Sequence, residues 1–323
     1  MDNNTEDKEA LDILSNLEES GDVKFDKEEK KVTSLGKASR QFMSDAGESP
    51  WKLVALNTLP SKGMMHDVEF EQLIKSAKTK EIRHWSTIDE YDPVDIFDKI
   101  AYVTESCSKL NIKGSNARLN SNDILEIDKY HILFKIHRIT FPNAENKLMA
   151  KVKCTSNSCD KISSIHTTDT NLKGFSYPME LMEWYSEEER CFVIPSEKLN
   201  ETLRLYMPTI GVTKVVNEYK ELCLSRGLSE DEAFDKIVPY LIDSWRTTSA
   251  EKLLELRNES NRWSENKFLF LHGATEALIK NSKNKVLGIC EKCKSKIASS
   301  IFLGGSFTVK DFFIISSRLR DLI

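Results

Sequence analysis

Apolar residues recur at helical spacing over much of the chain after residue 92. A helix is predicted to begin at Asp92, because this carboxylate precedes Pro93 and can accept a hydrogen bond from the first turn. A second helix is predicted from about residue 122 to about residue 136. The first helix should run to about residue 110, with an apolar face formed by Ile96, Phe97, Ile100, Val103, Thr104 and Cys107.

The stretch 196–285 is predicted to be helical throughout. Ser196 caps a helix that ends before Pro208, and Gly227 ends the next one. Pro239 must break or kink the helical run. Further helices are indicated by the capping boxes Ser229–Glu232 and Thr248–Glu251 and by the apolar spacing of Phe268, Leu271, Thr275 and Leu278.

Strand patterns are concentrated before the first helix. Residues 51–56 read as an extended segment that enters the turn Leu59–Gly63. Residues 68–74 alternate apolar and polar side chains, as a half-buried strand does. We therefore expect a small sheet within about residues 50–85.

The composition agrees with a helix-dominated α+β fold. Glycine supplies 12 and proline 8 of the 323 residues, about half of their usual combined share. This low share argues against an all-β sandwich, a collagen-like chain or low-complexity linkers. No stretch approaches the about 18 apolar residues of a membrane span, and the N-terminus lacks the apolar region of a secretion signal. The expectation is a soluble intracellular chain without a membrane partner.

Negative charge is concentrated at the N-terminus. Residues 1–32 contain eleven Asp or Glu and five Lys, while the whole chain has a net charge of −5. The remaining residues are therefore close to neutral, and bulk binding of nucleic acid is not expected. Residues 1–48 are predicted to be a disordered acidic arm, in which Leu11, Leu14 and Leu17 form a short apolar stripe that a partner could order as a helix.

Two pairs of cysteines have the spacing of metal-binding knuckles. Four residues separate Cys154 from Cys159, and two separate Cys290 from Cys293. Zinc in structural sites prefers four thiolate or imidazole ligands, and a tight turn brings two sulfurs to one point. Each pair lies between strand-like runs, which are 148–153 and 161–168 for the first pair and 285–289 and 294–303 for the second. Two such units at one metal make a zinc ribbon, so we predict a structural Zn²⁺ bound by Cys154, Cys159, Cys290 and Cys293.

Two other interpretations of these cysteines stay open at the level of sequence. Cys290 and Cys293 could form a redox pair, although no βαβ pattern surrounds them. The four could also be unrelated buried thiols. An odd total of seven cysteines argues against a disulfide framework. Cys107, Cys191 and Cys223 are predicted to be core residues.

No catalytic motif accompanies the knuckles. The chain contains no GxxxxGK[ST], GxGxxG, GxSxG or HExxH sequence. A zinc ion with four sulfur ligands has no open position for substrate. We therefore expect a protein that is not an enzyme and has no small-molecule substrate.

The predicted organisation has five parts. They are a disordered acidic arm (1–48), an α+β domain (49–145), a zinc-ribbon module formed by 146–175 and 285–307, a helical insertion (176–284) and a C-terminal helix (308–323).

Four segments within residues 53–140 carry a family resemblance. They are Leu56–Gly63 with its Leu-Pro-Ser-Lys-Gly turn, Glu81–Asp89, Asp92-Pro93 through Cys107, and Tyr130–Arg138 with its Leu-Phe-x-x-x-Arg pattern. In this order they resemble the T4-type phage baseplate family, the hub and hub-assembly proteins of contractile-tailed phages. Members tend to have a cysteine knuckle after the last of these helices, as Cys154 and Cys159 do here. The sequence departs from the family pattern at Met64-Met65-His66, after the glycine.

The resemblance implies a structural or assembly role in a phage tail baseplate. The partners would be other baseplate and tail proteins, and the protein would be assembled in the host cytoplasm and located in the virion. The family has no catalytic residues to transfer. A zinc-ribbon nucleic-acid-binding or transcription-associated factor is the alternative, against which the nearly neutral body of the chain argues.

Overall fold

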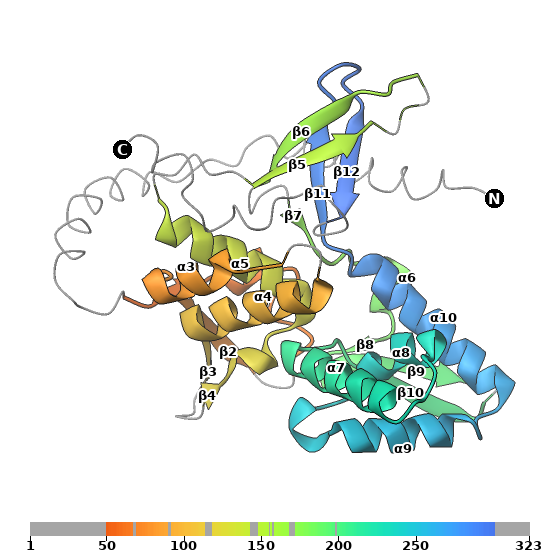
Figure 1. Ribbon diagram of the computed structural model, residues 1–323. Coiled ribbons are helices and arrows are strands. Elements are labelled where there is room, and N and C mark those ends of the chain that lie inside the picture. The colour runs from red at the N-terminus through yellow and green to blue at the C-terminus, as the bar shows by residue number, and fades with distance from the viewer. Residues whose placement is uncertain are drawn as a thin grey trace.

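A computed structural model describes residues 50–300, apart from 67–68, 90–91, 114–117, 143–147, 155, 157, 168–171 and 198. The predicted acidic arm (1–48), the end of the ribbon module (301–307) and the C-terminal helix (308–323) lie outside the described residues. Within them the chain is a mixed α+β protein with eight α-helices and small antiparallel sheets (Figure 1). None of the described helices is both long and apolar enough to cross a membrane.

The N-terminal part combines a four-stranded antiparallel sheet with three helices. Its strands have the order β1-β2-β3-β4 and are β1 (Lys52–Val54), β2 (Phe70–Ile74), β3 (Ser108–Ile112) and β4 (Arg118–Leu119). The helices are α3 (Thr79–Ser86), α4 (Pro93–Cys107) and α5 (Glu126–Thr140), with 3₁₀ turns η1 (Leu56–Thr58) and η2 (Ser121–Asp123). The predicted sheet thus extends past residue 85, because β3 and β4 complete it.

The predicted start of α4 is confirmed, and its end differs. The Asp92 carboxylate accepts a hydrogen bond from the Val94 amide at 2.9 Å, and Pro93 is the first helical residue. The helix ends at Cys107, where the chain passes directly into β3 instead of continuing to about residue 110. Pairing of Ser108–Ile112 with β2 replaces the last predicted turn.

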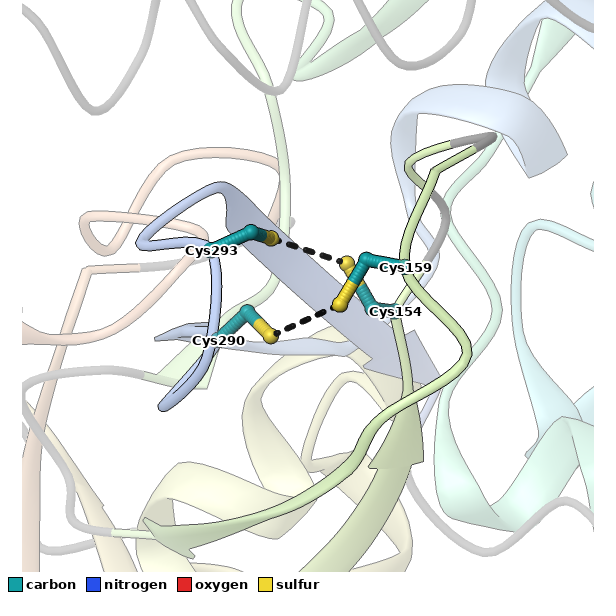
Figure 2. Close-up of side chains that lie close together, drawn as sticks. All are labelled: Cys154, Cys159, Cys290 and Cys293. Carbon is teal, nitrogen blue, oxygen red and sulfur yellow. Dashed lines mark hydrogen bonds between the residues drawn. The ribbon is translucent and has the colours of Figure 1, made fainter.

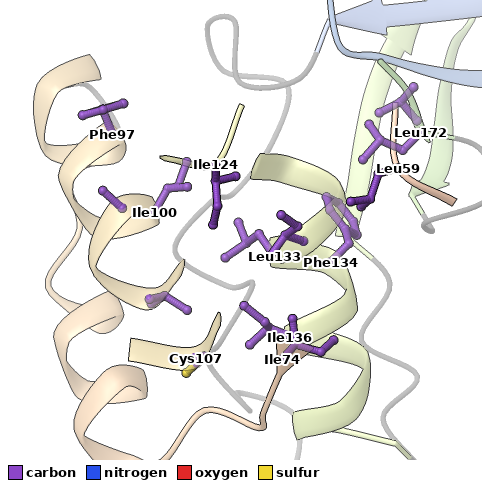
Figure 3. Close-up of a cluster of buried hydrophobic side chains, with 14 of the residues drawn as sticks. Leu59, Ile74, Phe97, Ile100, Cys107, Ile124, Leu133, Phe134, Ile136 and Leu172 are labelled. Carbon is purple, nitrogen blue, oxygen red and sulfur yellow. The ribbon is translucent and has the colours of Figure 1, made fainter. Parts of the chain in front are cut away.

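One apolar core joins these elements (Figure 3). Side chains of α4 and α5 face each other across it, with β2 and the turn after β1 at its sides. Its fully buried members include Trp85, Ile100, Leu110, Ile124 and Leu133. The core also continues into the cysteine-bearing hairpins through Val152, Ile165, Leu172, Val286 and Ile297.

A buried carboxylate fixes the Leu59–Gly63 turn to α5. Asp128 accepts hydrogen bonds from the Ser61 amide at 2.8 Å and from the Ser61 hydroxyl at 2.6 Å. Ser61 is fully buried and Asp128 is 1% exposed. Gly63 adopts the left-handed conformation with a φ of 79°, which a side chain rarely takes. The hydrogen bonds of Ser61 to Asp128 and the left-handed conformation of Gly63 therefore both stabilise the turn.

The segment 176–284 is a mixed unit rather than a helical block. It contains the antiparallel sheet β10-β9-β8, formed by β8 (Tyr185–Ser186), β9 (Cys191–Ser196) and β10 (Glu201–Leu205). The helix predicted from Ser196 to Pro208 is therefore wrong. Ser196 instead ends β9 and pairs with Glu201 of β10, because the cross-strand partner decides a short segment whose local pattern is ambiguous.

The later helices of this segment agree with their apolar spacing. They are α6 (Met179–Met182), α7 (Ile210–Ser225), α8 (Glu232–Ile237), α9 (Ala250–Ser260) and α10 (Glu265–Asn281), with 3₁₀ turns η3 (Val238–Tyr240) and η4 (Trp245–Thr247). Gly227 ends α7 with a φ of 67°, and the Leu228 amide donates to the Cys223 carbonyl. The caps of α8 and α9 are Asp231 and Ser249, two and one residues after the predicted caps.

Polar contacts join this segment to the N-terminal part. Asp123 accepts hydrogen bonds from Trp245 Nε1 at 2.9 Å and from the Arg246 guanidinium at 2.5 and 2.7 Å. Close by, the Glu126 amide donates to the Pro208 carbonyl at 2.9 Å. These bonds lie at the N-terminal end of α5, where both parts of the chain meet.

We predict that Asp128→Asn removes a pH dependence of stability. Burial raises the pKa of the Asp128 carboxyl to about 6, although the Ser61 hydrogen bonds lower it. In the unfolded chain the pKa returns to about 4, so between about pH 4 and 6 the folded state binds more protons. The free energy of unfolding of the wild-type protein should therefore fall by about 3 kcal/mol as pH rises through this window.

Urea denaturation at several pH values measures this difference. The Asp128→Asn variant, whose amide can still bond Ser61, should lack this fall. Asp98→Asn, which changes an exposed carboxylate of α4, is the control and should follow the wild-type profile. Parallel profiles for the wild type and Asp128→Asn would contradict the prediction.

Candidate metal centre

Two β-hairpins present the four predicted cysteines. The first pairs β5 (Leu148–Lys153) with β6 (Ile162–Thr167), and the second pairs β11 (Lys285–Ile289) with β12 (Lys296–Ser300). The short strand β7 (Leu172–Lys173) joins the second hairpin at the edge of β11. The strands predicted on both sides of each knuckle are thus confirmed.

The inner faces of the hairpins pack directly on each other. Val152 and Ile165 come from the first hairpin, and Val286 and Ile297 come from the second; all four are buried. A Cβ atom at Gly288 would lie 2.7 Å from the Ile165 side chain. Glycine at this position therefore permits the close approach that brings the two knuckles together.

The structure brings all four predicted ligands to one point (Figure 2). Cys154 Sγ lies 3.5 Å from Cys293 Sγ, and Cys159 Sγ lies 3.8 Å from Cys290 Sγ. All four sulfurs lie within 4.8 Å of one another. Four sulfurs at about 2.3 Å from a tetrahedral ion would be about 3.8 Å apart. The cluster therefore has the dimensions that a metal ion with four thiolate ligands requires.

Backbone hydrogen bonds close each knuckle. The Cys154 amide donates to the Lys161 carbonyl at 2.9 Å, and the Cys290 amide donates to the Ser295 carbonyl at 2.8 Å. Lys294 has a φ of 61°, in the left-handed region, and its amide donates to the Cys290 carbonyl. These bonds turn the chain sharply, so that both sulfurs of a knuckle point inward.

The surroundings lower the pKa of both thiols in the second knuckle, Cys290 and Cys293. The Cys293 amide and the Ser163 hydroxyl, whose oxygen lies 3.6 Å from the sulfur, lower the pKa of the Cys290 thiol to about 6. The neighbouring Ser295 hydroxyl lowers the pKa of Cys293. At Cys154 the Ser156 amide lowers the pKa, but burial and the other three thiols raise it to about 12. Four thiolates at this spacing repel one another, which a cation at their centre would relieve.

Two ion pairs connect the knuckles at the surface. Lys161 Nζ lies 3.7 Å from the Glu291 carboxylate, and Lys292 Nζ lies 3.9 Å from the Asp160 carboxylate. These side chains are between 46% and 91% exposed, so each pair contributes little to stability. Of the four cysteines in the cluster, Cys293 is exposed and the other three are buried.

The remaining cysteines lie apart from this cluster. Cys107, Cys191 and Cys223 are each no more than 5% exposed. Cys107 belongs to the N-terminal core and Cys223 packs between the helices of the 176–284 segment. They occupy core positions, as predicted.

Ser163 lies next to the cysteine cluster, and the sequence analysis did not indicate it as part of the site. Its hydroxyl donates to Cys290 Sγ and accepts a hydrogen bond from the Glu291 amide at 3.1 Å. It is fully buried between the hairpins. Its partners lie 127 and 128 positions away in the chain, so no local pattern could have identified it.

We predict that Ser163→Ala weakens binding of a divalent metal ion by roughly 10- to 100-fold, the usual effect of losing a group that orients a ligand. The loss follows because the thiolate of Cys290 would lose a donor and the Glu291 amide its acceptor. Competition with a chromogenic chelator measures the affinity. Ser164→Ala, at the adjacent exposed position, is the control and should bind like the wild type. Equal affinities for all three proteins would refute the role of Ser163.

Comparisons of the chain with models of known protein families, with curated proteins and with solved structures found no match.

Proposed function

We propose that the four cysteines bind one structural zinc ion per chain. The observation that supports this is the convergence of two knuckles, 131 positions apart, into a cluster of tetrahedral size. Four soft sulfur donors favour zinc or an iron–sulfur centre over magnesium, calcium or manganese. With all four positions filled by protein, the ion has no site for substrate and acts as a clamp between the hairpins.

We predict one equivalent of zinc in the purified wild-type protein. Cys293→Ser should lose most of it, because three thiolates and a hydroxyl form a much weaker site. The ribbon strands should then exchange amide hydrogens faster, since metal binding and folding are coupled. Cys223→Ser, a core substitution away from the cluster, should keep one equivalent.

Elemental analysis and hydrogen exchange with mass spectrometry provide these measurements. Well below one equivalent in wild-type protein would reject the zinc site. A metal-free protein with a disulfide between Cys290 and Cys293 would instead support the redox interpretation.

For the whole chain, we propose a structural or assembly role in the baseplate hub of a contractile phage tail. The support is the ordered set of segments that resembles the T4-type phage baseplate family. All four segments contribute side chains to the same core, including Leu59, Trp85, Phe97 and Leu133. The Leu-Pro-Ser-Lys-Gly turn also has a physical role here, because Ser61 is hydrogen-bonded to Asp128.

In this role the protein acts by contact with other baseplate and tail proteins rather than by catalysis. A stable contact of ordinary size would bury roughly 800 Å² on each partner. The protein would be assembled in the host cytoplasm and located in the virion. The metal clamp would keep the contact surfaces of the N-terminal part and of the inserted segment in a fixed arrangement.

Deletion of the gene in the phage that encodes it tests this proposal. Electron microscopy of the lysate should show free heads or tails without baseplates, and the wild-type gene should restore infectious particles. Normal contractile tails after deletion would overturn the baseplate role.

Complementation with cysteine variants separates the two proposals. Cys290→Ser with Cys293→Ser should fail to restore tails, whereas Cys223→Ser should restore them. Full rescue by the double variant would leave the baseplate role intact and remove the need for zinc.

A nucleic-acid-binding role is the second candidate, and local charge favours it. The two hairpin segments 148–167 and 285–300 contain seven lysines and only two acidic residues. Retention on double-stranded DNA that falls steeply between low and physiological salt would support this candidate. No retention at low salt would exclude it.

A further inference from the structure

The hairpins carry a positive charge that the rest of the chain does not. Their seven lysines stand against Asp160 and Glu291, a net charge of +5, whereas the whole chain has −5. Four thiolates with a divalent ion would carry about two negative charges, so a positive excess remains in the metal-bound state. The two acidic residues are already paired with Lys161 and Lys292.

Two exposed isoleucines lie next to the cysteines, on the same hairpins as the lysines. Ile162 and Ile289 are both 58% exposed. In the strand register Ile162 lies opposite Lys153, and Ile289 lies opposite Lys296. Each isoleucine is within three residues of a ligand cysteine, so both flank the same end of the ribbon. We call this surface the knuckle end; its residues are Lys153, Lys161, Ile162, Ile289, Lys292 and Lys294.

The chemistry of the knuckle end fits an acidic and apolar peptide better than a nucleic acid. Exposed isoleucines next to lysines offer apolar contact together with positive charge. Proteins that bind nucleic acids use arginine and aromatic side chains extensively. The hairpin segments 148–167 and 285–300 contain no arginine, phenylalanine, tyrosine or tryptophan.

The chain itself contains a segment of matching composition. Residues 6–19 have six acidic residues, one lysine and the apolar residues Leu11, Ile13, Leu14 and Leu17. Thirty residues, 20–49, separate this segment from the described part of the chain. A chain of that length can span up to about 100 Å, while a folded unit of about 250 residues has a radius of gyration of about 18 Å. The segment can therefore reach the knuckle end.

We propose that residues 6–19 dock on the knuckle end of the same chain. The carboxylates would face Lys153, Lys292 and Lys294, and the leucines would cover the exposed isoleucines. Docking would cover the lysines and the exposed isoleucines of the knuckle end. This inference goes beyond the proposed function, because it depends on neither the zinc ion nor the baseplate.

Carbodiimide cross-linking of the full chain tests this contact directly, since the reagent joins carboxylates to amines that touch. Mass spectrometry should find residues 6–19 joined mainly to Lys153, Lys161, Lys292 and Lys294. The yield should fall several-fold in high salt and be independent of protein concentration. Cross-links spread over lysines of the whole surface, or formed only between two copies, would overturn the proposal.

A variant that retains every charge sharpens the test. Leu11→Ser, Leu14→Ser and Leu17→Ser together leave all carboxylates and lysines in place, and they should lower the knuckle-end cross-links several-fold. Val23→Ser with Leu35→Ser, which changes apolar residues outside the segment, is the matched control and should not lower them. Equal yields from both variants would overturn docking of the apolar stripe. DNA retention that depends on Lys153 and Lys294, with no arm cross-links, would identify a nucleic-acid surface instead.

Discussion

Two hairpins that lie far apart in the chain hold four thiols at a single point. Closing a loop of 131 positions costs little more conformational entropy than closing a shorter one, because the cost grows only with the logarithm of length. The greater difficulty is electrostatic, because a metal site needs four ionised thiols, and four thiolates within 4.8 Å would repel one another. The inner faces of the hairpins pack on each other, which Gly288 permits, and this packing brings the two pairs of sulfurs together. A metal ion would supply the positive charge that balances the thiolates.

The ends of the hairpins opposite the cysteine-bearing turns lie next to the other parts of the chain (Figure 1). The chain enters the segment 176–284 and returns from it at neighbouring positions. Strand β7 pairs with β11, and the Ser176 amide donates a hydrogen bond to the Asn281 carbonyl at 2.9 Å. The apolar layer between the hairpins is continuous with the core of α4 and α5, and His131 of α5 contacts the Leu172 carbonyl at 3.0 Å. The pair of hairpins therefore connects the N-terminal part with the segment 176–284.

Local signals predicted those features that depend on neighbours in sequence. The Asp92 cap, the Gly227 stop and the strands around the cysteines were recognisable because each depends on a few adjacent residues. Strand β10 was missed because its pairing with β9 decides its conformation. The Ser61–Asp128 contact and the role of Ser163 joined residues 67 and 127 positions apart, for which a single sequence carries no local sign. The four cysteines were recognisable because the spacing within each pair is a local pattern. Their convergence, which joins distant residues, was inferred from the strands on both sides of each pair.

X-ray absorption spectroscopy at the zinc edge, on the purified full-length protein, tests the central claim most directly. If Cys154, Cys159, Cys290 and Cys293 hold the ion together, the spectrum should fit four sulfur neighbours at about 2.3 Å and no lighter ligand. A first shell with nitrogen or oxygen neighbours, or with fewer than four sulfurs, would contradict a clamp formed by the two knuckles.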